Sequence, residues 1–342
     1  MNFYEIVKYA VAQNASDIHL ASGNYPALRI DGSIVLYASP LTKELVEEIA
    51  KQCLPEDKYA EYQDTGDVDC AVDLEDSGRF RVNVFKQNKG TTVVLRTINS
   101  KTPDIQELAL PPQINKILEL KEGLVLVTGP TGSGKSTTLA AIINEFNKSR
   151  RSHIITIEDP IEYVHSPINC IINQREVGSD SASFTRALKA ALREDPDIIL
   201  VGEMRDLESI SIALTAAETG HLVLSTLHTI GAAKTIDRLV DVFPPSQQQQ
   251  VKAQLSMALK SVVSQRLLPR ANNKGRIAAF EIMYVNSAIS NLIKEGKTAN
   301  INQMIQTNFP SGMITLERSI QELADKGMIT KEVASEALFD VK

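Results

Sequence analysis

One octapeptide, residues 129–136 with the sequence Gly-Pro-Thr-Gly-Ser-Gly-Lys-Ser, constrains this chain more than any other stretch. It matches the phosphate-loop pattern G-x-x-x-x-G-K-[ST], in which glycines let backbone N–H groups approach a polyphosphate closely. An apolar run, 124–127, precedes the motif, and a helical pattern, 137–148, follows it. Because a phosphate loop needs a strand before it and a helix after it, we expect a nucleotide site on an α/β sheet.

The residues of this motif have distinct expected tasks. Lys135 should reach the β- and γ-phosphates of ATP, and the Ser136 hydroxyl should bind Mg²⁺. A glycine-rich turn that binds nothing is the alternative, and it is disfavoured because glycines, lysine and serine all stand in register behind the apolar run. The remaining residues expected to contact the nucleotide are Gly129, Pro130, Thr131, Gly132, Ser133, Gly134 and Thr137.

Apolar runs recur after the motif, at 154–157, 198–201 and 222–225, and helical patterns near 183–194 and 207–219 separate them. Runs that are apolar throughout and alternate with helices predict a buried, mainly parallel sheet. A further helix is expected near 113–121. The rest of the chain is expected to be mostly helical, over 231–241, 246–266, 287–295, 299–307, 315–326 and 330–338.

The first 98 residues predict a separate, small α+β domain. Residues 99–112 contain three prolines and show little periodicity, so they are the expected linker, and the second domain covers 113–342. The expected elements of the first domain are helices over 3–13 and 42–53, a strand at 15–20, a hairpin over 27–35 that turns at Asp31-Gly32, and strands at 79–86 and 91–98.

The strand at 79–86 places its arginines on a defined face. Phe80, Val82 and Val84 share one face by the period of two, and Arg79, Arg81 and Asn83 share the other. Arg81 therefore points away from the core of the small domain. From the residues alone, an ordinary solvated arginine is the competing interpretation.

Carboxylates follow two of the apolar runs of the second domain. Glu158, Asp159 and Glu162 come after 154–157, where they suit Mg²⁺ hydration or water orientation, although a loop capped by acids is the alternative. Glu203 follows 198–201, as in a Walker B motif, with Gly202 at the position where many phosphate-loop enzymes have an aspartate. Glu203 is the best candidate for the carboxylate that orients the attacking water.

Two histidines flank the run at 222–226. His228 follows it and is expected near the γ-phosphate, whereas His221 precedes it and serves a structural role equally well. An arginine should also stabilise charge on the γ-phosphate, and sequence order does not decide among Arg81, Arg96, Arg193, Arg205 and Arg238.

Composition excludes several classes of protein. The net charge of −6 argues against general binding to a nucleic-acid backbone, and no apolar run is long enough to span a bilayer. The three cysteines are far apart, without a C-x-x-C pair, which indicates reduced thiols in a cytoplasmic protein. We therefore expect no direct membrane insertion.

Several stretches taken together carry a resemblance to a known family. The chain resembles the bacterial secretion-type ATPases that drive type II secretion and type IV pili, and within them the pilus-retraction motors of twitching motility. The matching stretches are 15–20 (A-S-D-I-H-L), 80–83 (F-R-V-N), the phosphate loop, 157–163 (I-E-D-P-I-E-Y), 195–206 (from D-P-D-I to G-E-M-R-D), 219–229 (from T-G-H to S-T-L-H-T) and 265–270 (Q-R-L-L-P-R).

Two features favour retraction motors over assembly and type II secretion motors. The chain lacks the four-cysteine zinc insert that those relatives usually carry. Residues 288–295 have the sequence A-I-S-N-L-I-K-E and are similar to the retraction-type helix A-I-R-N-L-I-R-E, with Ser290 and Lys294 in place of its two arginines.

The resemblance implies a PAS-like α+β N-terminal domain followed by a RecA-like ATPase domain with a helical C-terminal region. It also implies a homohexamer that uses ATP and Mg²⁺, with each ATP between the two domains. Arg81 and Arg96 would reach the phosphates when the domains close. Glu162, Glu203 and His228 would lie near Mg²⁺, water and the γ-phosphate, and Ser136, Glu203 and Glu158 would contribute to the metal site.

The resemblance further implies pilus retraction, work done at the cytoplasmic face of the inner membrane, and an inner-membrane platform protein as partner. A pilus-assembly or type II secretion ATPase is the alternative. A RecA-like nucleic-acid motor is disfavoured by the acidic charge balance, and a nucleotide-gated scaffold without turnover is disfavoured by the intact Lys135, Ser136 and Glu203.

Overall fold

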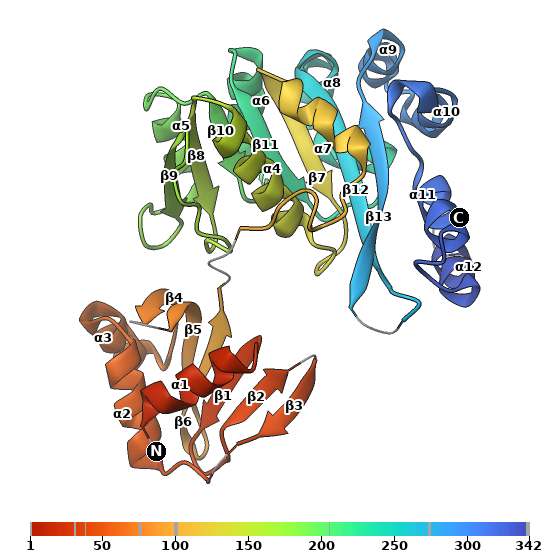
Figure 1. Ribbon diagram of the computed structural model, residues 1–342. Coiled ribbons are helices and arrows are strands. Elements are labelled where there is room, and N and C mark those ends of the chain that lie inside the picture. The colour runs from red at the N-terminus through yellow and green to blue at the C-terminus, as the bar shows by residue number, and fades with distance from the viewer. Residues whose placement is uncertain are drawn as a thin grey trace. The chain divides into compact units, whose positions relative to one another are not determined.

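A computed structural model gives the structure of the protein and divides the chain into two compact units (Figure 1). Unit 1 comprises Met1–Lys101 with Glu162–Val164, and unit 2 comprises Thr102–Ile161 with His165–Lys342. The structure describes residues 2–30, 32–37, 39–74, 77–98, 102–204, 206–272 and 275–339. The expected turn residue Asp31, the first residues of the expected linker (99–101) and Arg205 lie outside these ranges.

Unit 1 is an antiparallel sheet with helices on one face. Its strands lie in the order β3-β2-β1-β6-β5-β4, and residues of α1 and α2 pack with the inner side chains of the sheet in one apolar core. Helix α3 and strand β4 were not predicted. The elements of unit 1 are α1 (Phe3–Ala12), β1 (Asp17–Ala21), β2 (Ala27–Ile30), β3 (Ser33–Leu36), α2 (Lys43–Cys53), α3 (Glu56–Thr65), β4 (Asp67–Leu74), β5 (Gly78–Gln87) and β6 (Gly90–Thr97).

Strand β5 confirms the predicted alternation of faces. Phe80, Val82 and Val84 are fully buried in the core of unit 1, whereas Arg81 is only partly buried on the opposite face. Arg81 stands directly opposite Arg96 of β6 in the antiparallel register. The sheet therefore presents the two candidate arginines side by side, on the face that carries charge.

Unit 2 is built on a seven-stranded sheet in the order β13-β12-β7-β11-β10-β8-β9. Six strands are parallel to their neighbours, and only β13 runs antiparallel, beside β12. The mainly parallel sheet predicted from the sequence is confirmed. Its strands are β7 (Gly123–Thr128), β8 (His153–Glu158), β9 (Ile171–Glu176), β10 (Ile198–Val201), β11 (Leu222–Leu227), β12 (Leu259–Pro269) and β13 (Arg276–Tyr284).

Helices cover both faces of this sheet (Figure 1). In β7, Leu124 and Leu126 belong to the apolar core shared with α5 to α10, whereas Val125 and Val127 belong to the core shared with η1 and α4. A strand with both faces buried must be apolar at every position, which is why these strands were visible as uninterrupted apolar runs. The helical elements are η1 (Pro112–Glu119), α4 (Lys135–Ser149), α5 (Phe184–Ala191), α6 (Leu207–Glu218), α7 (Ala232–Asp241), α8 (Pro245–Ala258), α9 (Ser287–Glu295), η2 (Thr298–Asn300), α10 (Ile301–Thr307), η3 (Phe309–Ser311), α11 (Leu316–Asp325) and α12 (Lys331–Phe339).

The predicted helix over 246–266 is wrong in its second half. Helix α8 ends at Ala258, and the chain continues directly as strand β12. Val262 and Val263 are β-branched and buried, and they pair with Leu126 and Val127 of β7. Pairing with the central strand thus outweighs the helical periodicity that continues through this segment. Strand β13 was also missed.

Candidate nucleotide-binding site

The phosphate loop leaves the sheet at the carboxyl end of β7, between two fixed elements. All six residues of β7 are buried, and α4 begins at Lys135 with Gly134 at its N-cap. Gly134 has a φ of 89°, which a residue with a side chain rarely adopts. No side chain caps the first turn of α4, so its backbone N–H groups and the positive end of its dipole remain available to an anion.

The side chain of Lys135 is buried and folds back over the loop. Its Nζ donates hydrogen bonds to the carbonyl oxygens of Gly129, at 2.9 Å, and Pro130, at 3.1 Å. The ammonium group therefore already lies at the loop, where these two carbonyl oxygens accept its hydrogen bonds. Phosphate oxygens are charged acceptors and bind an ammonium group more strongly than carbonyls do, so a polyphosphate would compete for this lysine.

Two predicted residues from neighbouring strands meet beside the loop. Glu203 follows β10, His228 follows β11, and Glu203 Oε1 lies 3.2 Å from His228 Nε2. A carboxylate oxygen only accepts, so a hydrogen bond here would have Nε2 as its donor. The other ring nitrogen, Nδ1, lies 3.5 Å from Thr131 Oγ1 in the phosphate loop. A line of polar side chains therefore connects the acid after β10 with the loop after β7.

The backbone under Glu203 is fixed by the neighbouring strand. Thr226 of β11 donates a hydrogen bond from Oγ1 to the carbonyl oxygen of Gly202, at 2.6 Å. A Cβ at Gly202 would lie 3.3 Å from the Cα of Glu158, which is a tight contact. Glycine in place of the usual aspartate therefore allows the ends of β8 and β10 to lie close together. The hydrogen bond between Thr226 and the backbone of Gly202 was not predicted from the sequence.

The structure places the remaining candidate acids differently from one another. Glu158 ends β8, and its Oε1 accepts hydrogen bonds from Thr156 Oγ1, at 2.7 Å, and from Gln174 Nε2, at 3.4 Å. Its side chain is therefore bound to β8 and β9. Glu162 is exposed and belongs to the short segment that is grouped with unit 1. Within unit 2, Glu203 is thus the predicted acid that contacts His228 and, through it, the phosphate loop.

The two candidate arginines of unit 1 are each paired with an aspartate. Arg81 forms a bidentate contact with Asp69, in which its Nε lies 3.0 Å from both carboxylate oxygens. Arg96 Nε donates to Asp17 Oδ1 at 2.8 Å. Burial alone would raise the pKa of Asp17, but hydrogen bonds from Arg96 and Ser16 outweigh it, and the pKa is lowered. Asp17 is therefore a stable anion beside Arg96.

The side chains at the loop fit a magnesium ion that is held mainly by phosphate and water. Among the residues that the structure describes, no group of three or more His, Cys, Asp or Glu side chains is arranged to hold a metal by itself. Ser136, with its hydroxyl in the first turn of α4, and the carboxylates of Glu203 and Glu158 offer the oxygen ligands that Mg²⁺ prefers. That donor set suits a metal that arrives with its nucleotide.

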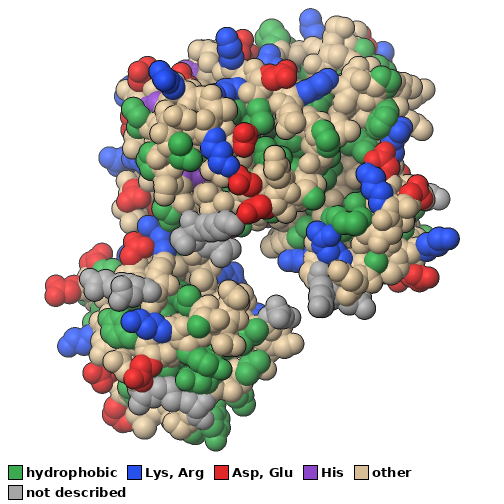
Figure 2. Space-filling view, in the orientation of Figure 1, with side chains coloured by type: hydrophobic (Ala, Val, Ile, Leu, Met, Phe, Trp, Pro, Cys, Tyr) green, Lys and Arg blue, Asp and Glu red, His purple; other side chains and the backbone are tan. Residues whose placement is uncertain are grey.

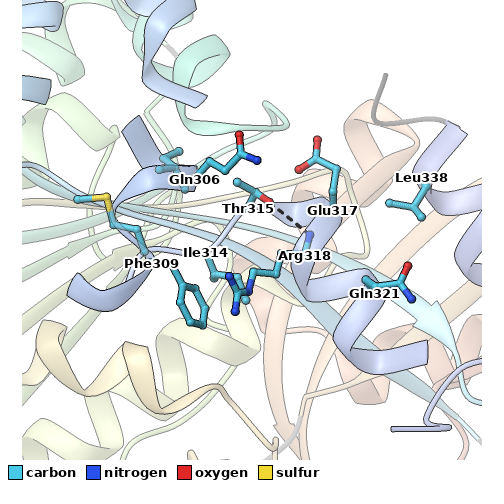
Figure 3. Close-up of a pocket in the computed structure, with 10 residues that line it drawn as sticks. Gln306, Phe309, Ile314, Thr315, Glu317, Arg318, Gln321 and Leu338 are labelled. Carbon is cyan, nitrogen blue, oxygen red and sulfur yellow. Dashed lines mark hydrogen bonds between the residues drawn. The ribbon is translucent and has the colours of Figure 1, made fainter. Parts of the chain in front are cut away.

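A cavity of about 370 Å³ lies elsewhere in unit 2, between η3, α11 and the end of α12 (Figure 3). Arg318 lies over the Phe309 ring, donates from Nε to Glu322 at 3.1 Å, and donates its backbone N–H to Thr315 Oγ1 at 3.3 Å. These contacts cap α11 and fix its first turn. None of the predicted site residues lines this cavity.

A buried parallel sheet with a phosphate loop after one strand and an acid and a histidine after the next two defines a P-loop nucleotide-binding protein. A family model described as "Type II/IV secretion system protein" matches residues 2–335. The chain belongs to this family and is an ATPase.

Individual relatives are similar over almost their whole length. The type IV pilus retraction ATPase PilT of Pseudomonas aeruginosa is 47% identical over 98% of both chains. The uncharacterized protein YggR of Escherichia coli is 44% identical over 96% of this chain and 100% of its own. A crystal structure of the pilus retraction motor PilT with bound ADP has a TM-score of 0.92 at 45% identity, covering 98% of this chain and 97% of that one. The resemblance inferred from the sequence is confirmed.

Proposed function

We propose that this chain is an ATP-driven motor that powers the retraction of type IV pili and twitching motility. The observation that carries the proposal is the chain of contacts from Glu203 through His228 to Thr131 of the phosphate loop. The ammonium group of Lys135 lies at the same loop. Such an arrangement suits hydrolysis as well as binding, because it adds a carboxylate that can orient water. The retraction role rests on similarity to relatives named for pilus retraction and twitching motility.

In the proposed mechanism each residue has one task. Lys135 exchanges its carbonyl partners for the β- and γ-phosphates, and the N–H groups of the loop and of the first turn of α4 bind the phosphate oxygens. Glu203 orients the attacking water, and His228 holds the Glu203 carboxylate and lies on the γ-phosphate side. Ser136, Glu203 and Glu158 would contribute to the magnesium site, partly through water. The metal would supply positive charge to the phosphate oxygens.

The arginines of unit 1 have a proposed role in the same reaction. Arg81 and Arg96 would reach the phosphates after releasing Asp69 and Asp17, and Glu162 would lie near the metal and the water. In enzymes that use an arginine finger, the positive charge of the arginine beside the γ-phosphate raises the rate of phosphoryl transfer by about 10³ to 10⁵. A guanidinium already ordered by a carboxylate loses less freedom when it changes partner.

The assembly and the partners are further parts of the proposal. We propose a homohexamer, in which the N-terminal domain (1–98) and the ATPase domain (113–342) move about the linker (99–112). The ring would act at the cytoplasmic face of the inner membrane through a platform protein of the pilus machinery. Within the described part of the chain, no helix combines the length and apolarity needed to cross a bilayer. On the face shown in Figure 2, acidic and basic side chains are interspersed, which does not favour a nucleic-acid partner.

The proposal is tested by deleting the gene and restoring it with the wild type or with Lys135→Ala. Surface pili and surface motility are scored in each strain. Abundant pili without movement in the deletion and Lys135→Ala strains would support retraction. Absent pili would overturn retraction in favour of assembly, and unchanged motility with unchanged pili would overturn both. Purified protein is assayed in parallel, where Lys135→Ala should abolish ATP hydrolysis.

A further inference from the structure

A buried glutamine outside the phosphate-loop motif contacts both ends of that loop. Gln265 lies in β12, which is hydrogen-bonded to β7, and its side chain is 3% exposed. Its Nε2 donates a hydrogen bond of 2.7 Å to the carbonyl oxygen of Ser133. We infer that Gln265 is a positioning residue for the phosphate loop, which it holds in the conformation that binds the nucleotide. This inference rests on the nucleotide site of the proposed function.

The orientation of the Gln265 amide follows from its partner. A backbone carbonyl oxygen only accepts hydrogen bonds, so the atom 2.7 Å from it must be the amide nitrogen. The Oε1 atom is buried and accepts no hydrogen bond from any residue that the structure describes. A buried amide oxygen without a partner costs free energy. The side chain therefore bears a cost in order to place its N–H on Ser133.

The backbone of Gln265 contacts the start of the same loop. A Cβ built on Gly129 would lie 2.3 Å from the Gln265 carbonyl oxygen, closer than such atoms ever approach. A Cβ built on Gly134 would lie 3.2 Å from Gln265 Nε2. Two glycines of the motif thus face this one residue, Gly129 because the backbone of β12 passes there and Gly134 because the glutamine amide does. Gln265 thus lies against the first residue of the loop and again against Ser133 and Gly134.

The hydrogen bond to Ser133 fixes the direction of a backbone N–H group. In a trans peptide the C=O and N–H bonds point in opposite directions. A Ser133 carbonyl that is bound toward β12 therefore turns the N–H of Gly134 away from β12. This N–H precedes the first turn of α4, where phosphate oxygens bind in a phosphate loop. The glutamine amide therefore opposes rotation of this peptide plane.

The neighbouring residue connects β12 to the other side of the site. Ser264 Oγ accepts a hydrogen bond of 2.9 Å from the backbone N–H of Gly231, three residues after His228. Adjacent residues of a strand face opposite sides, so Ser264 and Gln265 fix two different loops from one position in the sheet. Strand β12 is thus hydrogen-bonded both to the phosphate loop and to the segment that follows His228.

The test compares two variants that each remove one buried hydrogen bond to a backbone carbonyl from the same strand. Gln265→Met removes the bond to Ser133. The control Ser261→Ala removes the bond from Ser261 Oγ to the Met283 carbonyl, at 2.9 Å, which lies outside the loop. ADP affinity is measured by equilibrium titration, and stability is measured by thermal unfolding without nucleotide. Should Gln265→Met not fold, Gln265→Asn keeps the amide and shortens its reach by one methylene.

We expect Gln265→Met to weaken ADP binding about tenfold, the effect of roughly one hydrogen bond, while Ser261→Ala binds ADP as the wild type does. A purely structural role predicts equal ADP affinity in the two variants at similar loss of stability, and that result would overturn the inference. Wild-type protein and Lys135→Ala are titrated alongside. If the wild type itself fails to bind ADP, the proposed nucleotide site is wrong, which is a separate outcome.

Discussion

His165 makes the stability of this protein depend on pH in a way that one substitution isolates. The residue is buried in unit 2, where its backbone N–H donates to Gln174 Oε1 at 2.8 Å. Its ring Nδ1 is buried and has no hydrogen-bond partner among the described residues. Burial lowers the pKa of His165 from 6.5 to about 4, because a charged ring would lose its hydration. The substitution His165→Leu keeps a similar volume and removes the titration.

The sign and size of the effect follow from the two pKa values. Well above pH 6.5 the ring is neutral in both the folded and the unfolded chain, and it contributes no pH dependence. At pH 5 the unfolded ring is mostly protonated, whereas the folded ring stays mostly neutral. This difference lowers the free energy of unfolding by about 2 kcal/mol relative to pH 7. The full loss, reached below pH 4, is about 3 kcal/mol.

Thermal unfolding at pH 7 and pH 5, in wild type and His165→Leu, measures the effect. Other groups titrate in both proteins, so their contributions cancel in the comparison. For a domain of this size, about 2 kcal/mol corresponds to roughly 4–8 °C, by which the wild-type Tm should fall further than the Tm of the variant. Equal falls in Tm would refute the claim that burial of a neutral His165 carries this pH dependence.

Three further substitutions test the site. Glu203→Gln should keep ATP binding and lose most hydrolysis in a steady-state ATPase assay, and near wild-type turnover would remove the role assigned to Glu203. Arg81→Ala should lower turnover while the circular dichroism of unit 1 stays unchanged, because its partner Asp69 is also partly exposed. Gly129→Ala should abolish nucleotide binding in a titration, since its Cβ would lie 2.3 Å from the Gln265 carbonyl oxygen; retained binding would show that β12 yields at this point.

The parts of the site that follow a local pattern were predictable from the sequence. The phosphate loop is a contiguous motif, and β8, β10 and β11 are buried on both faces and therefore appear as uninterrupted apolar runs. The position of an acid or a histidine directly after such a run places it at the carboxyl edge of the sheet. Glu203 and His228 were found in this way, although their mutual contact required the strand order.

The segment that braces the loop was not predictable by the same means. From Val251 through Leu255 to Leu259 and Val262, buried side chains recur every three or four residues, which fits a helix as well as it fits the observed helix followed by a strand. Pairing with β7 decides the outcome, and β7 lies far away in the sequence. The bond from Gln265 to Ser133 spans 132 residues, so no local periodicity contains it.

The order of strands in the sheet determines which groups of the candidate site lie next to one another. In the sequence the strands occur as β7, β8, β10, β11 and β12, but in the sheet β12, β7, β11, β10 and β8 are successive neighbours. Across that edge the chain places in turn the glutamine that fixes the loop, the phosphate loop itself, His228, Glu203 and Glu158. Each of these groups therefore follows or lies on a strand whose neighbour in the sheet carries the next group. The hydrogen bonds of the sheet fix the backbone from which they extend. A change in the separation of β12 and β7 would alter the loop first, whereas a change between β11 and β10 would alter the Glu203–His228 contact. Under the proposed roles the pair β12–β7 serves binding and the pair β11–β10 serves hydrolysis, so Gln265→Met and Glu203→Gln should impair different steps of one reaction.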